Sequence, residues 1–103
     1  MKKIEIENTL LEIDTTSKFD KQLKKIQKQG KNIEKLILIV EQLANKKQLD
    51  SKYKDHQLID NSTYKNCREC HIEPDWLLIY KYKDDTLVLV LFATGSHSEL
   101  FSK

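Results

Sequence analysis

Three histidines, His56, His71 and His97, are the residues of this 103-residue chain best suited to proton transfer. His71 belongs to a Cys-His-Ile-Glu-Pro-Asp-Trp run that also contains the carboxylate of Asp75, and His97 follows a glycine near the C-terminal end. Because histidine titrates near neutral pH, a cluster of such groups can both accept and release a proton. Taken singly, each histidine is better explained as an ordinary surface or capping residue.

Two cysteines, Cys67 and Cys70, precede His71 and formally match the attachment pattern of haem c. The surrounding residues predict a strand, and residues three apart on a strand face opposite sides of the sheet. The two sulfurs would therefore not converge on a haem or on a zinc ion, and the only methionine is Met1. We expect two reduced cysteines in ordinary strand positions, with no metal and no cofactor.

Positive charge is concentrated in one part of the chain. Residues 18–54 contain eleven lysines and four acidic residues, whereas the whole chain has a formal net charge of only +2. A basic segment of this density can bind a polyanion by displacing its counterions. A solvated lysine face without a partner fits the same composition.

Length and composition predict one compact α+β domain that spans residues 1–103. A third of the residues are charged, and the chain contains only two glycines and one proline. The N-terminal residues alternate apolar with acidic side chains, unlike a signal peptide, and no later apolar run is long enough to span a membrane. We therefore expect a cytoplasmic protein without membrane contact.

Apolar residues at helical spacing predict two helices in the first half of the chain. Ser17 and Asp20 resemble a capping box at the start of the first helix, and Gly30 suits a left-handed cap at its end. The second helix begins at Asn32 and continues to Ala44. The short connection between the two predicts an antiparallel helical hairpin.

Strand patterns flank this hairpin on both sides. Period-two alternation at residues 4–7 predicts an edge strand, and residues 46–66 have no periodicity and are interpreted as a loop. Three strand-like runs follow, at residues 67–72, 76–83 and 86–94. The order β-α-α-β-β-β implies an antiparallel sheet with the helical hairpin packed on one face, and the last run is apolar enough to be an interior strand.

This frame suggests how the candidate residues could meet. His71 would end one strand and Asp75 would open the next, whereas His97 could join them only if the last strand runs alongside this pair. Proton-transfer groups in a basic neighbourhood, without a phosphate-binding glycine loop, suit metal-free cleavage of RNA. A base would remove the 2′-hydroxyl proton, an acid would protonate the leaving 5′-oxygen, and Arg68 or nearby lysines could stabilise charge on the phosphate.

Four segments, in order, resemble the YafQ branch of the RelE/ParE superfamily of type II toxins and cover nearly the whole chain. They are residues 18–21, 53–58, 68–80 and 94–101, of which the last two are the most specific. The resemblance implies a RelE-like fold and a ribosome-dependent mRNA endonuclease that cuts codons in the ribosomal A site. It also implies a cognate antitoxin, through which the toxin–antitoxin complex would bind operator DNA.

The resemblance places the functional positions of the family on six residues. The implied catalytic residues are His56, His71, Asp75 and His97, and the implied substrate-binding residues are Glu69 and Phe101. The cation Arg68 is a further candidate for substrate binding, and the lysine-rich first helix adds four candidates for ribosome binding: Lys21, Lys24, Lys25 and Lys28. After the His56 motif the chain continues about two residues longer than the family pattern, which affects where His56 lies. Phe101 could stack on an RNA base or simply pin the C-terminal segment to the core. Trp76 is expected to pack in the core.

Two further classes of function remain open at this point. Relatives in the same superfamily poison DNA gyrase without catalysis, and they would not need three histidines and an aspartate at these positions. A degenerate toxin could survive only as an antitoxin-binding or DNA-regulatory partner. The division of acid and base roles among the histidines is also open.

Overall fold

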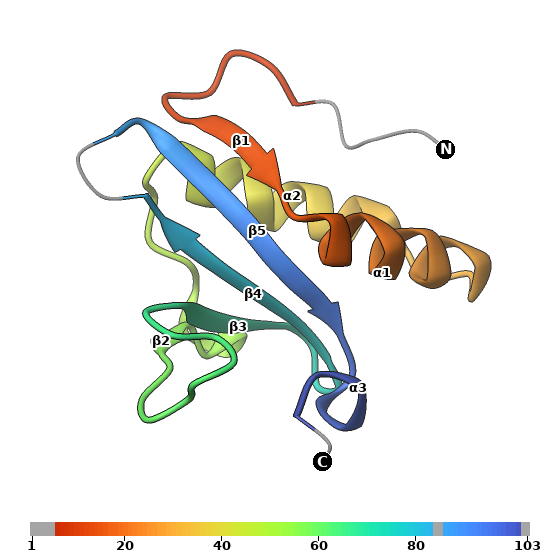
Figure 1. Cartoon of the computed structure of the whole chain (residues 1–103). Helices are drawn as coiled ribbons and strands as arrows, with labels where there is room; N and C mark the ends of the chain where they lie inside the picture. The colour runs from red at the N-terminus through yellow and green to blue at the C-terminus, as the bar shows by residue number, and fades with distance from the viewer. Residues whose placement is uncertain (1–5, 84–85, 102–103) are drawn as a thin grey trace.

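The computed structural model describes residues 6–83 and 86–101, in which five strands form one sheet in the order β1-β5-β4-β3-β2 (Figure 1). The predicted α+β arrangement of a helical hairpin on one face of the sheet is confirmed. The strands are β1 (Glu12–Thr15), β2 (His56–Gln57), β3 (Arg68–Glu73), β4 (Trp76–Tyr82) and β5 (Val88–Gly95). The helices are α1 (Ser17–Lys28), α2 (Ile33–Ala44), the 3-10 helix η1 (Ser51–Tyr53) and α3 (His97–Phe101).

The N-terminal strand differs from its prediction in position and direction. Residues 4 and 5 of the predicted strand lie outside the described residues, and Ile6 and Glu7 form no strand. The strand is β1 instead, and it pairs with β5 in parallel, so the otherwise antiparallel sheet contains one parallel pair. Apolar and polar residues alternate both in the predicted segment and in β1, but only β1 leads directly into α1. At this junction the Thr16 backbone N–H donates to the Leu91 carbonyl at 3.1 Å.

The two long helices begin and end with local hydrogen bonds. α1 is capped one residue earlier than predicted, at Thr16 rather than Ser17, because the Thr16 side chain accepts from the backbone N–H of Phe19. Gly30 has φ +81°, which confirms the predicted left-handed position. The side chain of Asn32 caps α2. Both helices have 12 residues, and no helix among the described residues is long and apolar enough to cross a membrane.

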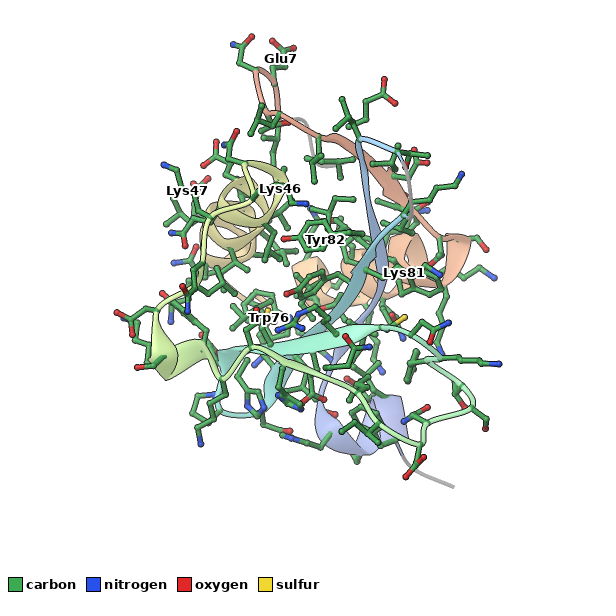
Figure 2. All side chains as sticks on the ribbon, turned by 90° about the vertical axis from the view of Figure 1, so that its left-hand side faces the viewer. Glu7, Lys46, Lys47, Trp76, Lys81 and Tyr82 are labelled. Carbon is green, nitrogen blue, oxygen red and sulfur yellow. The ribbon has the colours of Figure 1, made fainter. Side chains whose placement is uncertain are left out.

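The sheet buries apolar side chains on both faces. α1 and α2 cover one face over a core that includes Trp76 and Cys70, and Figure 2 shows the rings of Trp76 and Tyr82 between α2 and the sheet. The segment before β3 and helix α3 cover the other face, where Cys67 and Leu100 are buried. The two cysteines are free and lie on opposite faces, as the strand geometry predicted, and Trp76 packs in the core as expected.

The segment interpreted as a loop, residues 46–66, contains two short elements that the sequence did not reveal. The 3-10 helix η1 begins after Asp50, whose side chain accepts from the backbone N–H of Lys52. Lys54 then has a left-handed φ of 52°, and the chain enters β2. His56 in β2 pairs directly with Glu69 in β3. A strand of two residues is too short to produce a periodic pattern, so only the sheet places His56.

A buried polar contact between β4 and β5 generates a first prediction. The indole N–H of Trp76 donates to the Thr94 hydroxyl at 2.9 Å, and that hydroxyl donates to the Leu77 carbonyl at 2.7 Å. In the variant Thr94→Val, the indole and the carbonyl stay buried without this partner, so the free energy of unfolding should fall by about 1–3 kcal/mol. Chemical denaturation measures this change. Thr94→Ser retains the hydroxyl and is the matched control; equal stability of the valine variant and the wild type would contradict the prediction.

Candidate functional site

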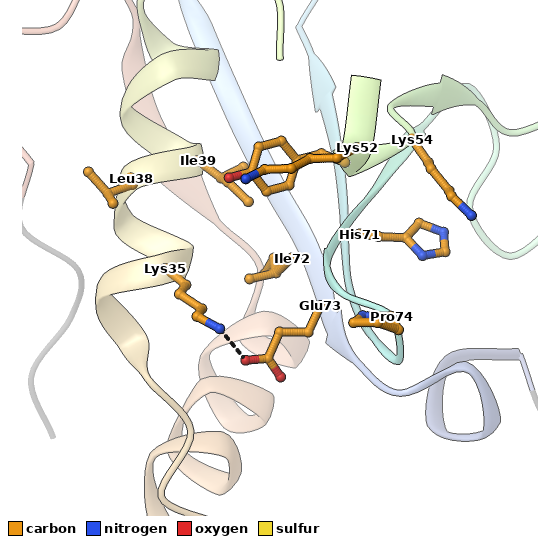
Figure 3. A pocket seen from close by; sticks show the side chains of 10 residues that line it. Lys35, Leu38, Ile39, Lys52, Lys54, His71, Ile72, Glu73 and Pro74 are labelled. Carbon is orange, nitrogen blue, oxygen red and sulfur yellow. Dashed lines mark hydrogen bonds and ion pairs between the residues drawn. The ribbon is translucent and has the colours of Figure 1, made fainter. Parts of the chain in front are cut away.

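His71 and His97 meet at one end of the sheet because both of their strands pair with β4. Leu77 of β4 lies opposite His71 in β3 and opposite Gly95 at the end of β5. His71 therefore stands beside the β3–β4 turn at Pro74 (Figure 3), and His97 begins α3 immediately after β5. The two imidazole rings lie 5.4 Å apart between centroids, at an interplanar angle of 61°. The last strand thus runs alongside the hairpin, which was the condition for His97 to join the group.

Asp75 holds His97 through two hydrogen bonds to one oxygen. Its Oδ1 accepts from the His97 backbone N–H at 2.9 Å and lies 2.7 Å from Nδ1 of the ring. The backbone hydrogen bond, followed by the one from the ring, lowers the pKa of the Asp75 carboxyl, which is exposed to solvent. The carboxylate can only accept, so Nδ1 of His97 carries the proton and Nε2 is left to face solvent or a substrate.

Glu69 lies between the other two histidines. Its Oε1 is 3.4 Å from Nε2 of His56 and 3.4 Å from Nε2 of His71, and the residue is only 6% exposed. His56 also places Nδ1 2.7 Å from the Lys54 carbonyl oxygen, which can only accept, so this nitrogen donates. The sequence assigned Glu69 to substrate binding; the structure shows a buried carboxylate that faces two imidazoles.

These residues form one row, which we call the histidine row: His56, Glu69, His71, His97 and Asp75. Histidines and carboxylates are also metal ligands. Within residues 6–83 and 86–101, however, no three His, Cys, Asp or Glu side chains have the mutual spacing of a metal site. Burial raises the pKa of both cysteine thiols, which keeps them protonated. Two adjacent imidazoles, each with a carboxylate beside a ring nitrogen, are arranged as general acid–base groups can be.

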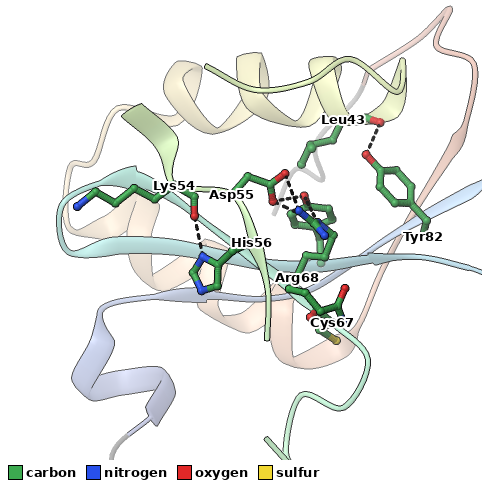
Figure 4. A network of polar contacts seen from close by, with 9 residues as sticks. Leu43, Lys54, Asp55, His56, Cys67, Arg68 and Tyr82 are labelled. Atoms are coloured by element: carbon green, nitrogen blue, oxygen red, sulfur yellow. Dashed lines mark hydrogen bonds and ion pairs between the residues drawn. The ribbon is translucent and has the colours of Figure 1, made fainter. Parts of the chain in front are cut away.

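Arg68 does not lie in the histidine row. It directs its guanidinium to the helix-covered side of the sheet, where it donates to Asp55 at 3.2 Å and to the Tyr80 hydroxyl at 3.3 Å (Figure 4). The Tyr80 hydroxyl also donates to Asp55. Burial, and then the hydrogen bond that its hydroxyl donates to Asp55, raise the pKa of Tyr80, so it stays a neutral donor. This network fixes Asp55, the residue before His56, and thereby supports the β2 segment.

Phe101 lies at the end of α3 and packs against a residue that the sequence did not single out. Its ring meets the Tyr64 ring edge to face, with 5.7 Å between centroids. The Tyr64 hydroxyl accepts from Lys18 at 2.9 Å and donates to the Leu100 carbonyl at 3.2 Å. Phe101 is half-buried and Leu100 is buried, so this pair anchors α3 while part of the Phe101 ring stays accessible. Tyr64 comes from an aperiodic segment, which gave no signal for it.

The four candidate ribosome-binding lysines lie on the exposed surface of α1. One of them, Lys25, pairs with Glu99 at 2.6 Å and so joins α1 to α3, the helix that begins with His97. The hydrogen bond from Lys25, and then the one from the Ser96 backbone N–H, lower the pKa of Glu99. The other three, Lys21, Lys24 and Lys28, are exposed. The basic helix therefore lies close to the histidine row without entering it.

The pKa of Asp75 gives a prediction that needs no substrate. Because folding lowers this pKa, the hydrogen bonds to Asp75 add stability above its unfolded pKa, and this stability disappears as the pH falls through the folded value. Carboxyl carbon signals in an NMR titration should therefore give Asp75 a midpoint below the ordinary aspartate value of about 3.9. In His97→Ala the ring hydrogen bond is absent but the backbone bond remains, so the midpoint should rise only part of the way. An Asp75 midpoint at or above the ordinary value in the wild type would contradict the two hydrogen bonds.

The chain is similar to known proteins over most of its length. The family model described as bacterial toxin of type II toxin–antitoxin system, YafQ, matches residues 11–102. An mRNA interferase toxin YafQ of Escherichia coli (strain B / BL21-DE3) is 40% identical over 91 residues, covering 87% of this chain and 95% of that relative.

Solved structures extend the likeness to three dimensions. A crystal structure of a metal-bound toxin from Helicobacter pylori superposes with a TM-score of 0.82 at 46% identity, covering 88% of this chain and 99% of that one. A crystal structure of the E. coli DinJ-YafQ complex gives a TM-score of 0.77 at 39% identity, covering 88% of this chain and 98% of that one. The fold that the resemblance implied is thereby confirmed. Because the matched residues include the whole histidine row and both helices beside it, this chain belongs to the YafQ family of bacterial toxins of type II toxin–antitoxin systems.

Proposed function

We propose that this toxin is an mRNA endonuclease that acts on the ribosome, cuts codons in the A site, and needs no bound metal for the chemical step. The observation that carries the proposal is the contact between His71 and His97, each of which has a carboxylate within 3.4 Å of a ring nitrogen. Two adjacent imidazoles can supply one general base and one general acid to the same phosphodiester. The curated relatives are named as mRNA interferase toxins, which agrees with this chemistry.

In the proposed reaction, one imidazole removes the proton from a ribose 2′-hydroxyl, and O2′ attacks the adjacent phosphorus. The bond from phosphorus to the 5′-oxygen breaks, and the second imidazole, in its protonated form, gives its proton to that oxygen. The products are a 2′,3′-cyclic phosphate and a 5′-hydroxyl. Asp75 orients His97 in the manner of a catalytic triad, with Nδ1 held and Nε2 free. Glu69, whose Oε1 lies 3.4 Å from a ring nitrogen of each, orients His56 and His71.

The negative charge that develops on the phosphate requires a cation beside the histidine row. Arg68 does not supply it, because its guanidinium is bound to Asp55 and Tyr80 on the helix-covered side of the sheet. Two lysines are better placed. The carbonyl of Lys54 holds His56, and Lys31 is near enough to Asp75 for its charge to contribute to the lowered pKa of that carboxyl. Preorganised cations of this kind stabilise the charge that develops in the transition state. Phe101, at the end of α3, is placed to stack on an unstacked base.

We assign three partners to the toxin: the ribosome, the mRNA that it carries, and a cognate antitoxin. The exposed lysines of α1 would contact ribosomal RNA, because polyanions bind such a face by counterion release. The E. coli relative forms a complex with DinJ, which supports an antitoxin partner here. Through that antitoxin the complex would bind operator DNA. Ribosomes and mRNA are cytoplasmic, so the proposed activity implies that the protein acts in the cytoplasm.

The decisive experiment separates chemistry from ribosome binding. His97→Ala should reduce single-turnover cleavage on programmed ribosomes by about a hundred- to ten-thousand-fold, because one acid–base group is removed. Its co-sedimentation with ribosomes should stay near that of the wild type. In the wild type, mapped 5′ ends should follow the reading frame, and the products should carry the cyclic phosphate.

The complementary variant replaces Lys21, Lys24 and Lys28 by alanine and keeps Lys25, which holds Glu99 beside His97. It should weaken ribosome binding. The slope of the logarithm of the binding constant against the logarithm of salt concentration should fall by up to about one for each lysine that binds a phosphate in the wild type. Saturating ribosomes should restore its cleavage rate. Growth arrest with intact mRNA and inhibited gyrase would refute the proposed activity. Loss of ribosome binding in His97→Ala would instead make His97 structural.

Independence from metal is tested with a chelator that binds transition metals and leaves magnesium for the ribosome. Cleavage by the wild type should continue at the same rate, because side chains perform both proton transfers. The control is the same reaction with each metal added back. Cleavage that stops with the chelator and returns with zinc, manganese or copper would contradict the metal-free step.

A further inference from the structure

We propose that the groove between α2, η1 and the β3–β4 turn is a subsite for a nucleotide of the mRNA strand, adjacent to the bond that is cut (Figure 3). The inference rests on the proposed function and adds a second binding position to it. The groove has a volume of about 470 Å³ and is open on one side. That size falls within the range of about 300–1,000 Å³ that is typical of small-ligand sites.

The groove is continuous with the histidine row. His71 is one of its lining residues, together with Ile72, Glu73 and Pro74. β2 pairs with β3 only at Arg68 and Glu69, so no other strand pairs with the outer edge of β3 from His71 onward within the described residues. An RNA strand whose phosphate lies at His71 can therefore pass over this edge, and its next nucleotide would enter the groove.

The floor of the groove is apolar and offers a surface for a base. Leu38, Ile39, Tyr53 and Ile72 line it, and the large apolar side chain of Leu38 is 57% exposed. An exposed leucine alone is common, but this one lines a concave site that also includes the aromatic ring of Tyr53. Single-stranded nucleic acids bind sites that combine such flat or apolar faces with a cationic path for the backbone.

The rim of the groove carries a positive charge. Lys35, Lys52 and Lys54 line it with a single carboxylate, Glu73. Glu73 is already bound by Lys35 at 2.9 Å and by Lys31 at 3.6 Å, so the ammonium groups outweigh it. The Lys52 ammonium lies 5.2 Å from the centre of the Tyr53 ring, which keeps this charge over the aromatic wall. The groove thus presents cations to a phosphate and an apolar face to its base, which favours a nucleotide over a purely apolar peptide.

Binding is tested on the isolated toxin with a trinucleotide whose ribose oxygens are 2′-O-methylated, so that it cannot be cleaved. Amide signals of Leu38, Ile39 and Tyr53 should shift during an NMR titration together with those of the histidine row. Leu38→Glu places a carboxylate in the groove and should raise the half-saturating concentration about tenfold, which corresponds to one base-stacking interaction of about 1.4 kcal/mol. Equal shifts with inorganic pyrophosphate, or shifts confined to the histidine row, would overturn the subsite.

A charge-matched pair of variants carries the test to the ribosome. Lys52→Glu changes the groove, and Lys47→Glu makes the same charge change at an exposed lysine that does not line it. Circular dichroism establishes that both are folded. Lys52→Glu should slow single-turnover cleavage and alter the preference for the flanking nucleotide, whereas Lys47→Glu should do neither.

The outcomes distinguish the two proposals. If the wild type cuts no ribosome-bound mRNA, the proposed function fails. If the wild type cuts mRNA and Lys52→Glu and Leu38→Glu cut at the same rate and positions, the activity stands and the subsite is wrong. If both groove variants cleave normally but are no longer neutralised by the antitoxin, the groove is a protein-binding surface and the nucleotide subsite is refuted.

Discussion

The pairing of Leu77 with two strands at once is the constraint on which the rest of the site depends. Leu77 of β4 lies opposite His71 on one side and Gly95 on the other, and its carbonyl accepts the buried hydroxyl of Thr94. A shift of one residue in either register would turn the neighbouring side chains to the other face of the sheet. The distance between two histidines 26 positions apart in sequence is therefore set by backbone pairing at one end of β4, the middle strand of the sheet.

The two carboxylates of the histidine row act in different surroundings. Glu69 is buried, and burial of a carboxylate costs free energy unless hydrogen-bond donors or cations surround it. Its contacts with His56 and His71 offset this cost and hold the two imidazoles in position. Asp75 is exposed and screened by water, and its two hydrogen bonds to His97 contribute orientation more than stability. Glu69 thus positions the imidazoles of His56 and His71, and Asp75 positions the solvent-facing ring of His97.

The distribution of charge links the helices to this site. Lys25 joins α1 to α3, and Lys35 joins α2 to the β3–β4 turn through Glu73. Both ion pairs are partly exposed, so each adds little to stability, but each places further lysines beside the histidine row. The same helices whose apolar sides build the core therefore present a cationic border around one end of the sheet. An anionic polymer would meet positive charge on two sides of the residues that perform the chemistry.

The sequence by itself determined the elements whose patterns are local. Apolar spacing located α1 and α2, Gly30 marked a helix end, and the alternation rule placed Cys67 and Cys70 on opposite faces. The chemistry of the residue types singled out the three histidines and Asp75, and the resemblance to a toxin family supported them and added Glu69. Only the tertiary structure decided which of the two alternating segments became β1. It also decided that Asp55 and Tyr80 hold Arg68 away from the histidine row, and that Tyr64 packs against Phe101. These outcomes depend on interactions between residues far apart in the chain, and a local pattern does not specify the partner that a side chain will meet.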